Sequence, residues 1–506
     1  MSGEIRDILV IGGGINGVGI AADAAGRGLS VTLCEMNDLA SATSSNSSKL
    51  IHGGLRYLEY HEYRLVREAL AEREVLLKKA PHIIEPLRIR LPHQAHLRPA
   101  WLIRIGLFLY DHLSKRNLLK GSHSVKFGDS DPLNNTLRKG FEFSDARVDD
   151  ARLVILNAFE ARNQGAEIKT RSRCVEAVRV NELWKVTLEN QLTGSSETLY
   201  ARALVNAAGP WVSHLFNDAL KVQPEKQIRL VKGSHIIVPK IHTQTEAYML
   251  QNEDERIVFV IPYEEDFSLI GTTDVEHEGD PGAAEISTEE VDYLIEITNQ
   301  YFKAKLAAKD IVATYSGVRP LISDESENAQ AVTRDYTFEL SSDGNQAPLL
   351  SIYGGKITTY RKLAEAVVDR LSPFFPLMTA PWTATQHLPG GDFSDRRAHS
   401  QSLARELPWL PSSLCERYTR TYGTLCKTFL QGVKNIDDMG EHLGGGLYQR
   451  EVDYLFESEW AKSAEDILWR RTKLGLVLTD SEQDALNQYI LQTYGLEIAL
   501  ESQQCA

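Results

Sequence analysis

Three glycines near the start of the chain have the spacing of a dinucleotide-binding turn. Gly12, Gly14 and Gly17 follow the apolar residues 7–11 and open an alanine-rich stretch, so the turn would connect a strand to a helix. The first glycine permits a tight turn, the second lets the backbone approach a pyrophosphate, and the third lets the helix pack closely on the strand. Because the positive end of the helix faces the phosphates, the pattern predicts a bound dinucleotide. The alternative is a glycine turn that binds no ligand.

The residues after the second predicted strand, 29–34, indicate which dinucleotide fits. Glu35 directly follows that strand. There an acidic side chain can accept hydrogen bonds from ribose hydroxyls, which suits NAD or FAD and disfavours NADP. Residues 42–49 add hydroxyls, an amide and an amine that could bind a pyrophosphate, a ribityl chain and a flavin edge. These groups favour FAD, the alternative being a solvated serine loop.

Two further turns of small residues could approach the same ligand. Residues 204–209 form an apolar strand that ends in Ala208 and Gly209, and Gly355 precedes Lys356 and a helical stretch. Small residues permit close approach of the backbone, and the helix N-terminus could point at the flavin or its ribityl chain. The alternative for each is an ordinary turn between a strand and a helix.

Four segments of the chain together resemble one enzyme family. Segments 11–28 and 354–364 closely resemble the two signatures of the FAD-dependent glycerol-3-phosphate dehydrogenases, and segments 48–58 and 315–320 are similar to other parts of that family. The resemblance runs from about residue 5 to 375 and continues into the helical tail. It is closest to the bacterial aerobic type, which is linked to the respiratory chain.

The resemblance implies an enzyme of glycerol metabolism with noncovalent FAD. It would oxidise sn-glycerol 3-phosphate to dihydroxyacetone phosphate by hydride transfer to the flavin and pass the electrons to a membrane quinone. The sequence lacks the calcium-binding loop of the mitochondrial relatives and an obvious insertion of the oxygen-using oxidases. A glycerophosphate oxidase, an amine- or amino-acid-oxidising flavoprotein and a non-enzymatic nucleotide-binding module remain as alternatives.

The motifs and the resemblance together predict a set of FAD contacts. They are Gly12, Gly14, Ile15, Asn16, Gly17, Glu35, Thr43, Ser44, Ser48, Lys49, Leu50, His52, Ala208, Gly209, Gly355, Lys356 and Thr358.

A phosphate ester needs several cations, and the planar fork of arginine matches phosphate oxygens best. The predicted substrate-binding residues are Arg56, Tyr57, Arg319, Arg334 and Lys356. Single arginines on strands more often form surface salt bridges, but Arg319 and Arg334 lie in motif-like segments.

The oxidation of an alcohol also needs a base, and histidine is the usual one near neutral pH. His235 is the favoured base and His52 a flavin neighbour, while a hydrogen-bonded core histidine is the alternative for each. We therefore predict His235 and Arg319 as the catalytic residues. His93 and His96 have no third ligand nearby, so no metal site is predicted.

Residues 97–116 have the composition of a helix that lies on a membrane surface. Basic and aromatic side chains accompany this apolar stretch, namely Arg98, Arg104, Lys115, Arg116, Trp101, Phe108 and Tyr110. Such a helix would lie in the headgroup layer. A buried core helix is the alternative. Peripheral attachment to the inner face of the cytoplasmic membrane would suit a lipid-soluble quinone, which places the protein in the cytoplasm.

The order of predicted elements indicates an α/β fold. We expect an FAD-binding, Rossmann-like, doubly wound domain with an antiparallel-sheet cap that binds substrate, followed by a helical C-terminal domain. Asp149 and Asp150 would begin a helix, and strands are expected at 257–261 and 267–270. The predicted boundaries are 1–375 for the oxidoreductase domain, with FAD-binding parts at about 1–80, 150–225 and 311–375 and cap parts at about 81–149 and 226–310; 376–394 for a linker rich in Pro and Gly; and 395–506 for the helical domain.

Composition and charge fit a large globular protein. The 506 residues are 42% hydrophobic and 25% charged, and the net charge of −14 argues against attraction of the whole chain to nucleic acid. Five dispersed cysteines without a CxxC pair suggest neither a disulfide framework nor a zinc ribbon and fit a reducing compartment. We expect no signal peptide and no membrane span. The sequence leaves the oligomeric state open, with a homodimer as one option.

Overall fold

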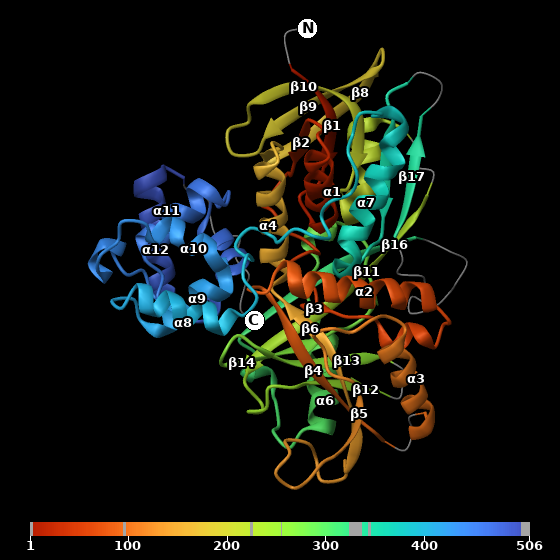
Figure 1. The fold of residues 1–506 in the computed structure, drawn as a ribbon, viewed down its shortest axis with the longest axis vertical. Coiled ribbons are helices and arrows are strands. Elements are labelled where there is room, and N and C mark those ends of the chain that lie inside the picture. The colour runs from red at the N-terminus through yellow and green to blue at the C-terminus, as the bar shows by residue number, and fades with distance from the viewer. Residues whose placement is uncertain are drawn as a thin grey trace.

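The computed structural model describes residues 4–94, 98–222, 226–252, 254, 256–322, 336–342 and 346–496. Two sheets lie end to end along the long axis, and a group of helices packs beside them (Figure 1). The expected α/β class, with a second, mostly antiparallel sheet and a helical C-terminal part, is confirmed. Within the described residues, no helix combines the length and apolar character needed to cross a bilayer.

The first sheet contains the predicted dinucleotide-binding unit. Its strands run in the order β17 (Thr337–Ser341), β18 (Leu349–Tyr353), β10 (Ser196–Asn206), β1 (Ile5–Ile11), β2 (Val31–Cys34) and β7 (Glu167–Lys169), with β8 (Ser172–Val180) and β9 (Leu183–Asn190) attached through β10. From β18 to β7 the neighbours are parallel. Since successive side chains of a strand point to opposite faces, β1 buries Ile8 and Val10 on one side and Leu9 and Ile11 on the other.

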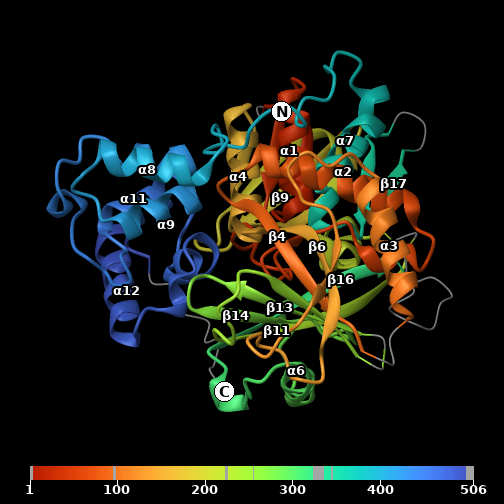
Figure 2. The same cartoon turned by 60° about the horizontal axis from the view of Figure 1, so that its bottom comes forward.

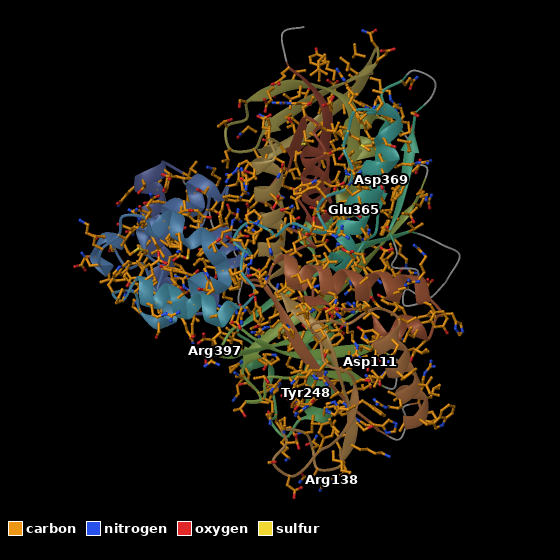
Figure 3. All side chains as sticks on the ribbon, viewed as in Figure 1. Asp111, Arg138, Tyr248, Glu365, Asp369 and Arg397 are labelled. Atoms are coloured by element: carbon orange, nitrogen blue, oxygen red, sulfur yellow. The ribbon has the colours of Figure 1, made fainter. Side chains whose placement is uncertain are left out.

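Three helices cover the face of this sheet that Ile8 and Val10 occupy. They are α1 (Ile15–Gly26), α4 (Asp150–Asn163) and α7 (Tyr360–Leu371). Asp149 caps α4 by accepting a hydrogen bond from Arg152 N, as its sequence predicted. Arg27, just beyond α1, forms ion pairs with Asp23 at 2.6 Å and with Asp369 of α7 at 2.5 Å. Figure 3 labels Asp369 on α7. This buried arginine therefore joins two helices that are far apart in sequence.

The second sheet forms the cap. Its strands run in the order β15 (Val275–Glu276), β11 (Ile228–Pro239), β14 (Phe267–Gly271), β13 (Ile257–Tyr263), β12 (Ala247–Gln251), β4 (Ile84–Pro92), β6 (Lys139–Val148) and β3 (Leu50–Ile51), and β5 (His123–Lys126) pairs with β6. Helix α6 (Thr288–Tyr301) covers one face, and α2 (Tyr63–Lys79) with α3 (Ala100–His112) contributes to the core of the other.

One strand lies in a different part from the one predicted. β16 (Ala313–Ile322) was expected in the FAD-binding part at 311–375, but it pairs with β11 along its whole length, from Ala313 opposite Ile237 to Ile322 opposite Ile228. Ten consecutive pairs of residues place it firmly in the cap sheet. A local apolar pattern identifies a strand but not its partner, which explains the error.

Helix α3 has an exposed apolar face. Trp101, Ile105 and Phe108 are 65%, 48% and 58% exposed, whereas Leu107 is buried. Tyr110, predicted as an interfacial aromatic, is instead 1% exposed and donates a hydrogen bond from its hydroxyl to Asp145 at 2.7 Å. A polar hydroxyl with a buried partner is stable in the core, which explains why this tyrosine points inward.

The chain after α7 forms a separate helical core beside both sheets (Figure 2). Its α-helices are α8 (Arg396–Glu406), α9 (Ser412–Tyr422), α10 (Cys426–Leu430), α11 (Gln449–Ser458) and α12 (Asp480–Tyr494). Residues 376–394, the predicted linker, contain neither helix nor strand, and their backbone is hydrogen-bonded to Arg27 just after α1 and to Lys79 at the end of α2. The domain boundaries themselves stay predictions.

Candidate functional site

The glycine turn has the close approaches that its motif predicted. Gly12 has a φ of 116°, in the region that favours glycine, and a Cβ there would collide with the carbonyl of Ala207. A Cβ at Gly17 would collide with the carbonyl of Gly12. Gly14 differs, because a Cβ there would meet only Ser44 Oγ, at 3.1 Å. Gly12 and Gly17 are therefore needed for the close approach of backbone segments within the fold, while Gly14 faces the loop that follows β2.

Glu35 closes the other side of this turn. Its carboxylate accepts hydrogen bonds from Gly13 N at 2.6 Å and Asn37 N at 2.8 Å. Burial raises the pKa of Glu35, and these two donors partly offset the rise. The acid thus lies beside the glycine turn, where the sequence placed it.

The serine-rich loop connects the glycine turn with the cap sheet. Ser44 Oγ accepts a hydrogen bond from Ile15 N at 3.0 Å, in the first turn of α1. Thr43 donates to the carbonyl of Val318 on β16 at 2.6 Å, and Ser48 Oγ lies 2.9 Å from His235 Nε2 on β11. Three of the predicted FAD contacts are therefore held by hydrogen bonds to α1 and to the cap sheet, in a loop that is half-buried.

The second small-residue turn meets the first. Asn16 Nδ2 donates to the carbonyl of Gly354 at 3.2 Å, and His52 N donates to Thr358 Oγ1 at 3.2 Å. Gly355 has a φ of 98°. The 208–209 turn joins them through Ala207 N, which donates to the carbonyl of Ile11 at 2.9 Å. All the predicted cofactor segments thus lie around one point.

This arrangement fits a bound dinucleotide. Asn16 Oδ1 is buried and, among the described residues, has no hydrogen-bond donor. A buried acceptor without a partner costs free energy unless a ligand or water supplies a donor. Asn16 lies in the first turn of α1, and a Cβ at Gly14 would meet only Ser44 Oγ, so the positive end of the helix is open to the approach of a pyrophosphate. Residues from four segments could therefore hold FAD.

His235 is a buried titratable group in this region. It is 1% exposed, and its ring stacks on Tyr315 with the centroids 4.7 Å apart. Burial lowers the pKa of His235 well below its usual value, and the positive charges of Arg319 and Lys49 lower it further. Nδ1 is buried without a hydrogen-bond partner in the described part of the chain. At neutral pH the imidazole is therefore neutral and has a lone pair available for a proton.

Arg319 lies on β16 opposite Val231, four residues along the paired strands from His235. Its guanidinium forms an ion pair with Asp274, and its side chain is 26% exposed. Sequence analysis did not identify Asp274, because it lies in no motif. Arg319 and His235 thus form one group of side chains on the face of the cap next to the serine-rich loop.

The other predicted cations lie in a second group. Lys356 Nζ lies 3.6 Å from the centroid of the Tyr57 ring, which brings together two predicted substrate-binding residues. Arg56 and Tyr57 belong to the same short helix, η1 (Leu55–Leu58), and Arg56 lies near Glu59 and the ring of Tyr60. Arg334 lies outside the described residues.

Lys49 has a role that its motif did not predict. It is 7% exposed, and its Nζ donates to Asp150 Oδ1 and to the carbonyl of Ser45, each at 2.8 Å. The amine also lies 5.0 Å from the centroid of Tyr315. The side chain of Lys49 thus anchors the loop to the start of α4. The sequence signal for this contact was the pair Asp149 and Asp150 at the start of α4, but that pair predicted only a helix cap and not a partner for Lys49.

Two family models cover most of the chain. The model described as FAD dependent oxidoreductase matches residues 7–361, and that described as C-terminal domain of alpha-glycerophosphate oxidase matches residues 381–496. Among solved structures, a glycerol-3-phosphate dehydrogenase from Bacillus halodurans complexed with FAD has a TM-score of 0.77 and 28% identity, covering 98% of this chain and 92% of that chain. An L-alpha-glycerophosphate oxidase from Mycoplasma pneumoniae has a TM-score of 0.59, 18% identity and coverage of 76% and 99%, which shows the fold alone.

Curated relatives match over nearly the whole chain. A glycerol-3-phosphate dehydrogenase from Pseudomonas aeruginosa is 59% identical, covering 96% of this chain and 95% of its own. The aerobic glycerol-3-phosphate dehydrogenase of Escherichia coli is 53% identical, with coverage of 99% and 100%. A D-erythritol 1-phosphate dehydrogenase from Brucella abortus is 50% identical, with coverage of 96% and 98%. The chain therefore belongs to the FAD-dependent oxidoreductase family, in the group of the bacterial glycerol-3-phosphate dehydrogenases, and its cofactor is FAD.

Proposed function

We propose that this enzyme oxidises sn-glycerol 3-phosphate to dihydroxyacetone phosphate. The observation that carries the proposal is the pairing of a neutral, buried His235 with Arg319 on adjacent strands, beside the segments that could hold FAD. One group can accept a proton and the other can bind a phosphate. The names of the full-length relatives support the same substrate.

FAD, when bound, supplies the acceptor for the hydride that leaves C2 of the substrate. The residues proposed to hold it are those of the glycine turn, Glu35, the serine-rich loop and the 354–358 turn. Their contacts with one another support this assignment, since four distant segments are ordered around one point.

His235 is proposed to take the proton of the C2 hydroxyl. When Nε2–H donates to Ser48 Oγ, Nδ1 holds the lone pair that accepts this proton. A serine hydroxyl can accept this hydrogen bond, so the contact with Ser48 is compatible with the tautomer in which Nδ1 accepts the proton.

Arg319 is proposed to bind the substrate phosphate. Asp274 holds the guanidinium in place before substrate binds, so little side-chain freedom is lost on binding. Lys356, whose amine lies over the Tyr57 ring, and Arg56 are proposed to add positive charge, and Arg334 is a further candidate. Several cations are needed because the substrate phosphate carries close to two negative charges.

A longer polyol phosphate is the second candidate substrate. The observation that favours it is the 50% identity to a D-erythritol 1-phosphate dehydrogenase, nearly as high as that to the E. coli enzyme. Both substrates are phosphate esters of polyols, so the same base and the same phosphate site would serve.

Anaerobic mixing of the FAD-loaded enzyme with candidate substrates tests the assignment. The loss of flavin absorbance is followed with sn-glycerol 3-phosphate, D-erythritol 1-phosphate, glycerol, glycine and sarcosine. We expect the largest second-order rate constant with sn-glycerol 3-phosphate. A larger constant with D-erythritol 1-phosphate would select the second candidate, and reduction by the amines instead of the phosphate esters would overturn both.

The electron acceptor is proposed to be a membrane quinone that reaches the enzyme at helix α3. The exposed apolar face of α3 supports contact with lipid. The opposite side of this helix reaches the flavin segment, because Tyr110 Oη accepts a hydrogen bond from Gly53 N at 2.8 Å, next to His52. Helix α3 is thus hydrogen-bonded to Gly53, the residue after His52, which is a proposed flavin neighbour. Peroxide formed at the turnover rate in air would favour oxygen as acceptor instead.

A further inference from the structure

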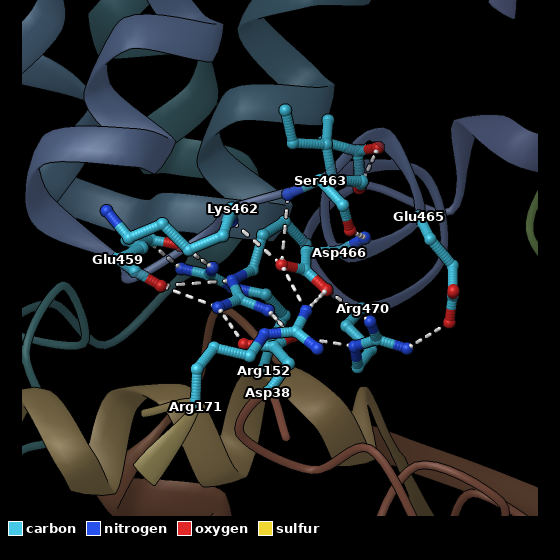
Figure 4. A network of polar contacts seen from close by, with 12 residues as sticks. Asp38, Arg152, Arg171, Glu459, Lys462, Ser463, Glu465, Asp466 and Arg470 are labelled. Carbon is cyan, nitrogen blue, oxygen red and sulfur yellow. Dashed lines mark hydrogen bonds and ion pairs between the residues drawn. The ribbon is translucent and has the colours of Figure 1, made fainter. Parts of the chain in front are cut away.

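A buried ion-pair network joins the C-terminal helices to the loop after β2 (Figure 4). Asp38, 1% exposed, accepts hydrogen bonds from Arg470 Nε at 2.6 Å and from Arg471 Nη1 and Nη2 at 2.5 and 2.8 Å. Both arginines belong to the π-helix η10 (Asp466–Arg471). Three bonds on one buried carboxylate are strong because both partners are charged.

The two arginines are themselves held by the C-terminal domain. Arg471 Nη2 donates to the carbonyl of Glu459 at 2.6 Å, and Arg470 pairs with Asp466. Asp466 also accepts from Arg171, at the turn before β8, at 2.9 Å. Burial acts to lower the pKa of Arg470, but Asp38 and Asp466 hold it above its usual value. Arg470 is therefore charged, and the contacts with Asp466 and with the Glu459 carbonyl hold both arginines in place where they meet Asp38.

Asp38 in turn fixes the residues that support the glycine turn. Ala40 has a φ of 60°, which a residue with a side chain adopts only when its surroundings impose it. In that conformation Ala40 N donates to the carbonyl of Gly13 at 3.2 Å. The side chain of Leu39 lies 3.0 Å from where a Cβ of Gly13 would be. The contact thus runs from Arg471 through Asp38 to the dinucleotide-binding turn.

A second contact reaches the other end of the same loop. Lys473 forms an ion pair with Asp149, the cap of α4. The neighbouring Asp150 accepts from Lys49 Nζ at 2.8 Å and from Ser47 Oγ at 2.7 Å. Lys49 has a φ of 55°, a second strained residue in the loop. The C-terminal domain therefore contacts residues 38–49 directly at Asp38, and near their other end it contacts Asp149, next to the Asp150 that binds Ser47 and Lys49.

We propose that the C-terminal helical domain is a positioning element of the flavin site, which acts by holding residues 38–49 through Asp38 and Asp149. This assigns a function in cofactor binding to a part of the chain that contributes none of the proposed FAD contacts. It rests on the proposed placement of FAD beside residues 43–49, and it is independent of the identity of the substrate.

Asp38→Asn tests the contact of Asp38 with Arg470 and Arg471, because it removes the negative charge and keeps the shape of the side chain. The variant is compared with the unaltered enzyme for the dissociation constant of FAD, the visible circular dichroism of the bound flavin and the unfolding temperature of the FAD-free protein. We expect the FAD dissociation constant to rise by about tenfold or more, with a changed flavin dichroism at temperatures where the protein stays folded.

Glu459→Gln is the matched control. It breaks the ion pair of Glu459 with Arg152, which joins the same two parts of the chain and is 0% exposed on both sides. The Arg152 side chain also donates to the carbonyl of Thr421, which lies outside residues 38–49, and the Glu459 carbonyl that holds Arg471 is retained. We expect a lower unfolding temperature and an FAD dissociation constant within about twofold of the original.

Two results would overturn the proposal. One is an unchanged FAD affinity and flavin dichroism in Asp38→Asn. The other is an equal loss of FAD in Glu459→Gln, which would mean that the interface only stabilises the fold. Should Asp38→Asn not fold, Arg471→Lys decides the matter: it keeps the charge, and the proposal requires it to retain more FAD than Arg471→Met. Because FAD binding is measured without substrate, a wrong substrate assignment would not affect these outcomes.

Discussion

The charges around His235 make its basicity depend on the substrate. Arg319 and Lys49 both act to keep the imidazole neutral before substrate binds. A phosphate group bound at Arg319 would cancel part of that positive charge and so raise the pKa of His235. The base would then become strongest when the phosphate is in place. A substrate without a phosphate would meet a weaker base, so binding and proton transfer favour the same substrates.

Arg319→Ala is expected to remove this preference. The substitution should lower kcat/KM for sn-glycerol 3-phosphate by about 2–4 kcal/mol in transition-state terms, because it deletes a charge-assisted hydrogen bond to the phosphate. The rate with glycerol, which has no phosphate, should change much less. Stopped-flow reduction of the flavin with both substrates measures the ratio.

Arg319→Lys is the control for this prediction, since it keeps the charge but loses the planar fork. It should fall between the original enzyme and the alanine variant. A preference for the phosphate ester that survives unchanged in Arg319→Ala would show that other cations bind the phosphate.

At the scale of residues, predictability followed distance along the chain. Gly12, Gly17 and Glu35 could be placed from the sequence because their neighbours lie within one βαβ unit. The contact of Ser48 with His235 spans 187 positions, and the partner of Arg319, Asp274, lies in no motif. Such contacts depend on which strands pair, which a local pattern does not encode.

At the scale of elements, the segment between α7 and α8 is firmly packed. The end of α2 holds it, since Leu388 N donates to the carbonyl of Lys79 at 2.8 Å and Lys79 Nζ donates to the carbonyl of Thr383 at 3.1 Å. His82 lies beneath it, 0% exposed, with its ring close to the backbone of Gly390. Neither of its ring nitrogens has a hydrogen-bond partner among the described residues.

This histidine should make the fold sensitive to acid. Burial lowers the pKa of His82 to about 3, and the positive charges of Arg152, Arg396 and His399 contribute, opposed by Asp149. Below a pH of about 6.5 the unfolded chain binds a proton that the native state excludes. Stability is therefore present above that pH and is lost as the pH falls toward 3, at about 1.4 kcal/mol for each pH unit.

His82→Leu is expected to reduce the loss. Urea unfolding at about pH 7 and about pH 5 should show a difference in unfolding free energy smaller by about 2 kcal/mol in the variant. The comparison uses the change with pH, so any packing cost of leucine cancels. His242, whose pKa burial lowers to about 4, stays in both proteins and cancels too. An equal pH dependence in both proteins would contradict the assignment.

Elements with a clear local period were predictable, and their partners were not. Strands β13 and β14 and helices α1 and α4 lie where apolar spacing and caps indicated. The prediction that β16 lies in the FAD-binding part was wrong, because β16 pairs with β11 of the cap sheet. On α3, the apolar pattern did not show that Tyr110 points inward. Its position is set by Asp145 on β6, far along the chain.

At the scale of the whole molecule, the chain is acidic, but helix α3 presents exposed apolar side chains to solvent. The chain carries a net charge of −14, which would repel it from an anionic membrane. Helix α3 carries exposed Trp101, Ile105 and Phe108 together with an exposed Arg104. Two other basic residues of the predicted set are already paired, Arg98 with Glu59 at 3.2 Å and Arg116 with Asp111 at 3.5 Å. Apolar contact should therefore contribute more to membrane binding than charge.

The double substitution Arg104→Glu with Phe108→Ser tests attachment through α3. Each exposed cation near an anionic surface contributes about 1 kcal/mol, and apolar side chains contribute roughly 25 cal/mol for each Å² removed from water. The variant should sediment less with anionic liposomes and reduce a lipid-embedded quinone more slowly. Turnover with a water-soluble dye should persist, because neither side chain takes part in the contact of Tyr110 with Gly53.

A matched control separates this effect from a general change of surface. Leu377→Ser with Arg397→Glu removes an apolar side chain that is 95% exposed and an exposed cation, both outside α3. Figure 3 labels Arg397. Its liposome binding should equal that of the original enzyme. If the control loses as much binding as the α3 variant, attachment depends on overall charge and hydrophobicity.

If dye turnover in the α3 variant falls together with liposome binding, the outer face of α3 supports the flavin segment itself. Since high salt screens charge but not apolar contact, the binding that remains in salt should be the part that Phe108→Ser alone reduces.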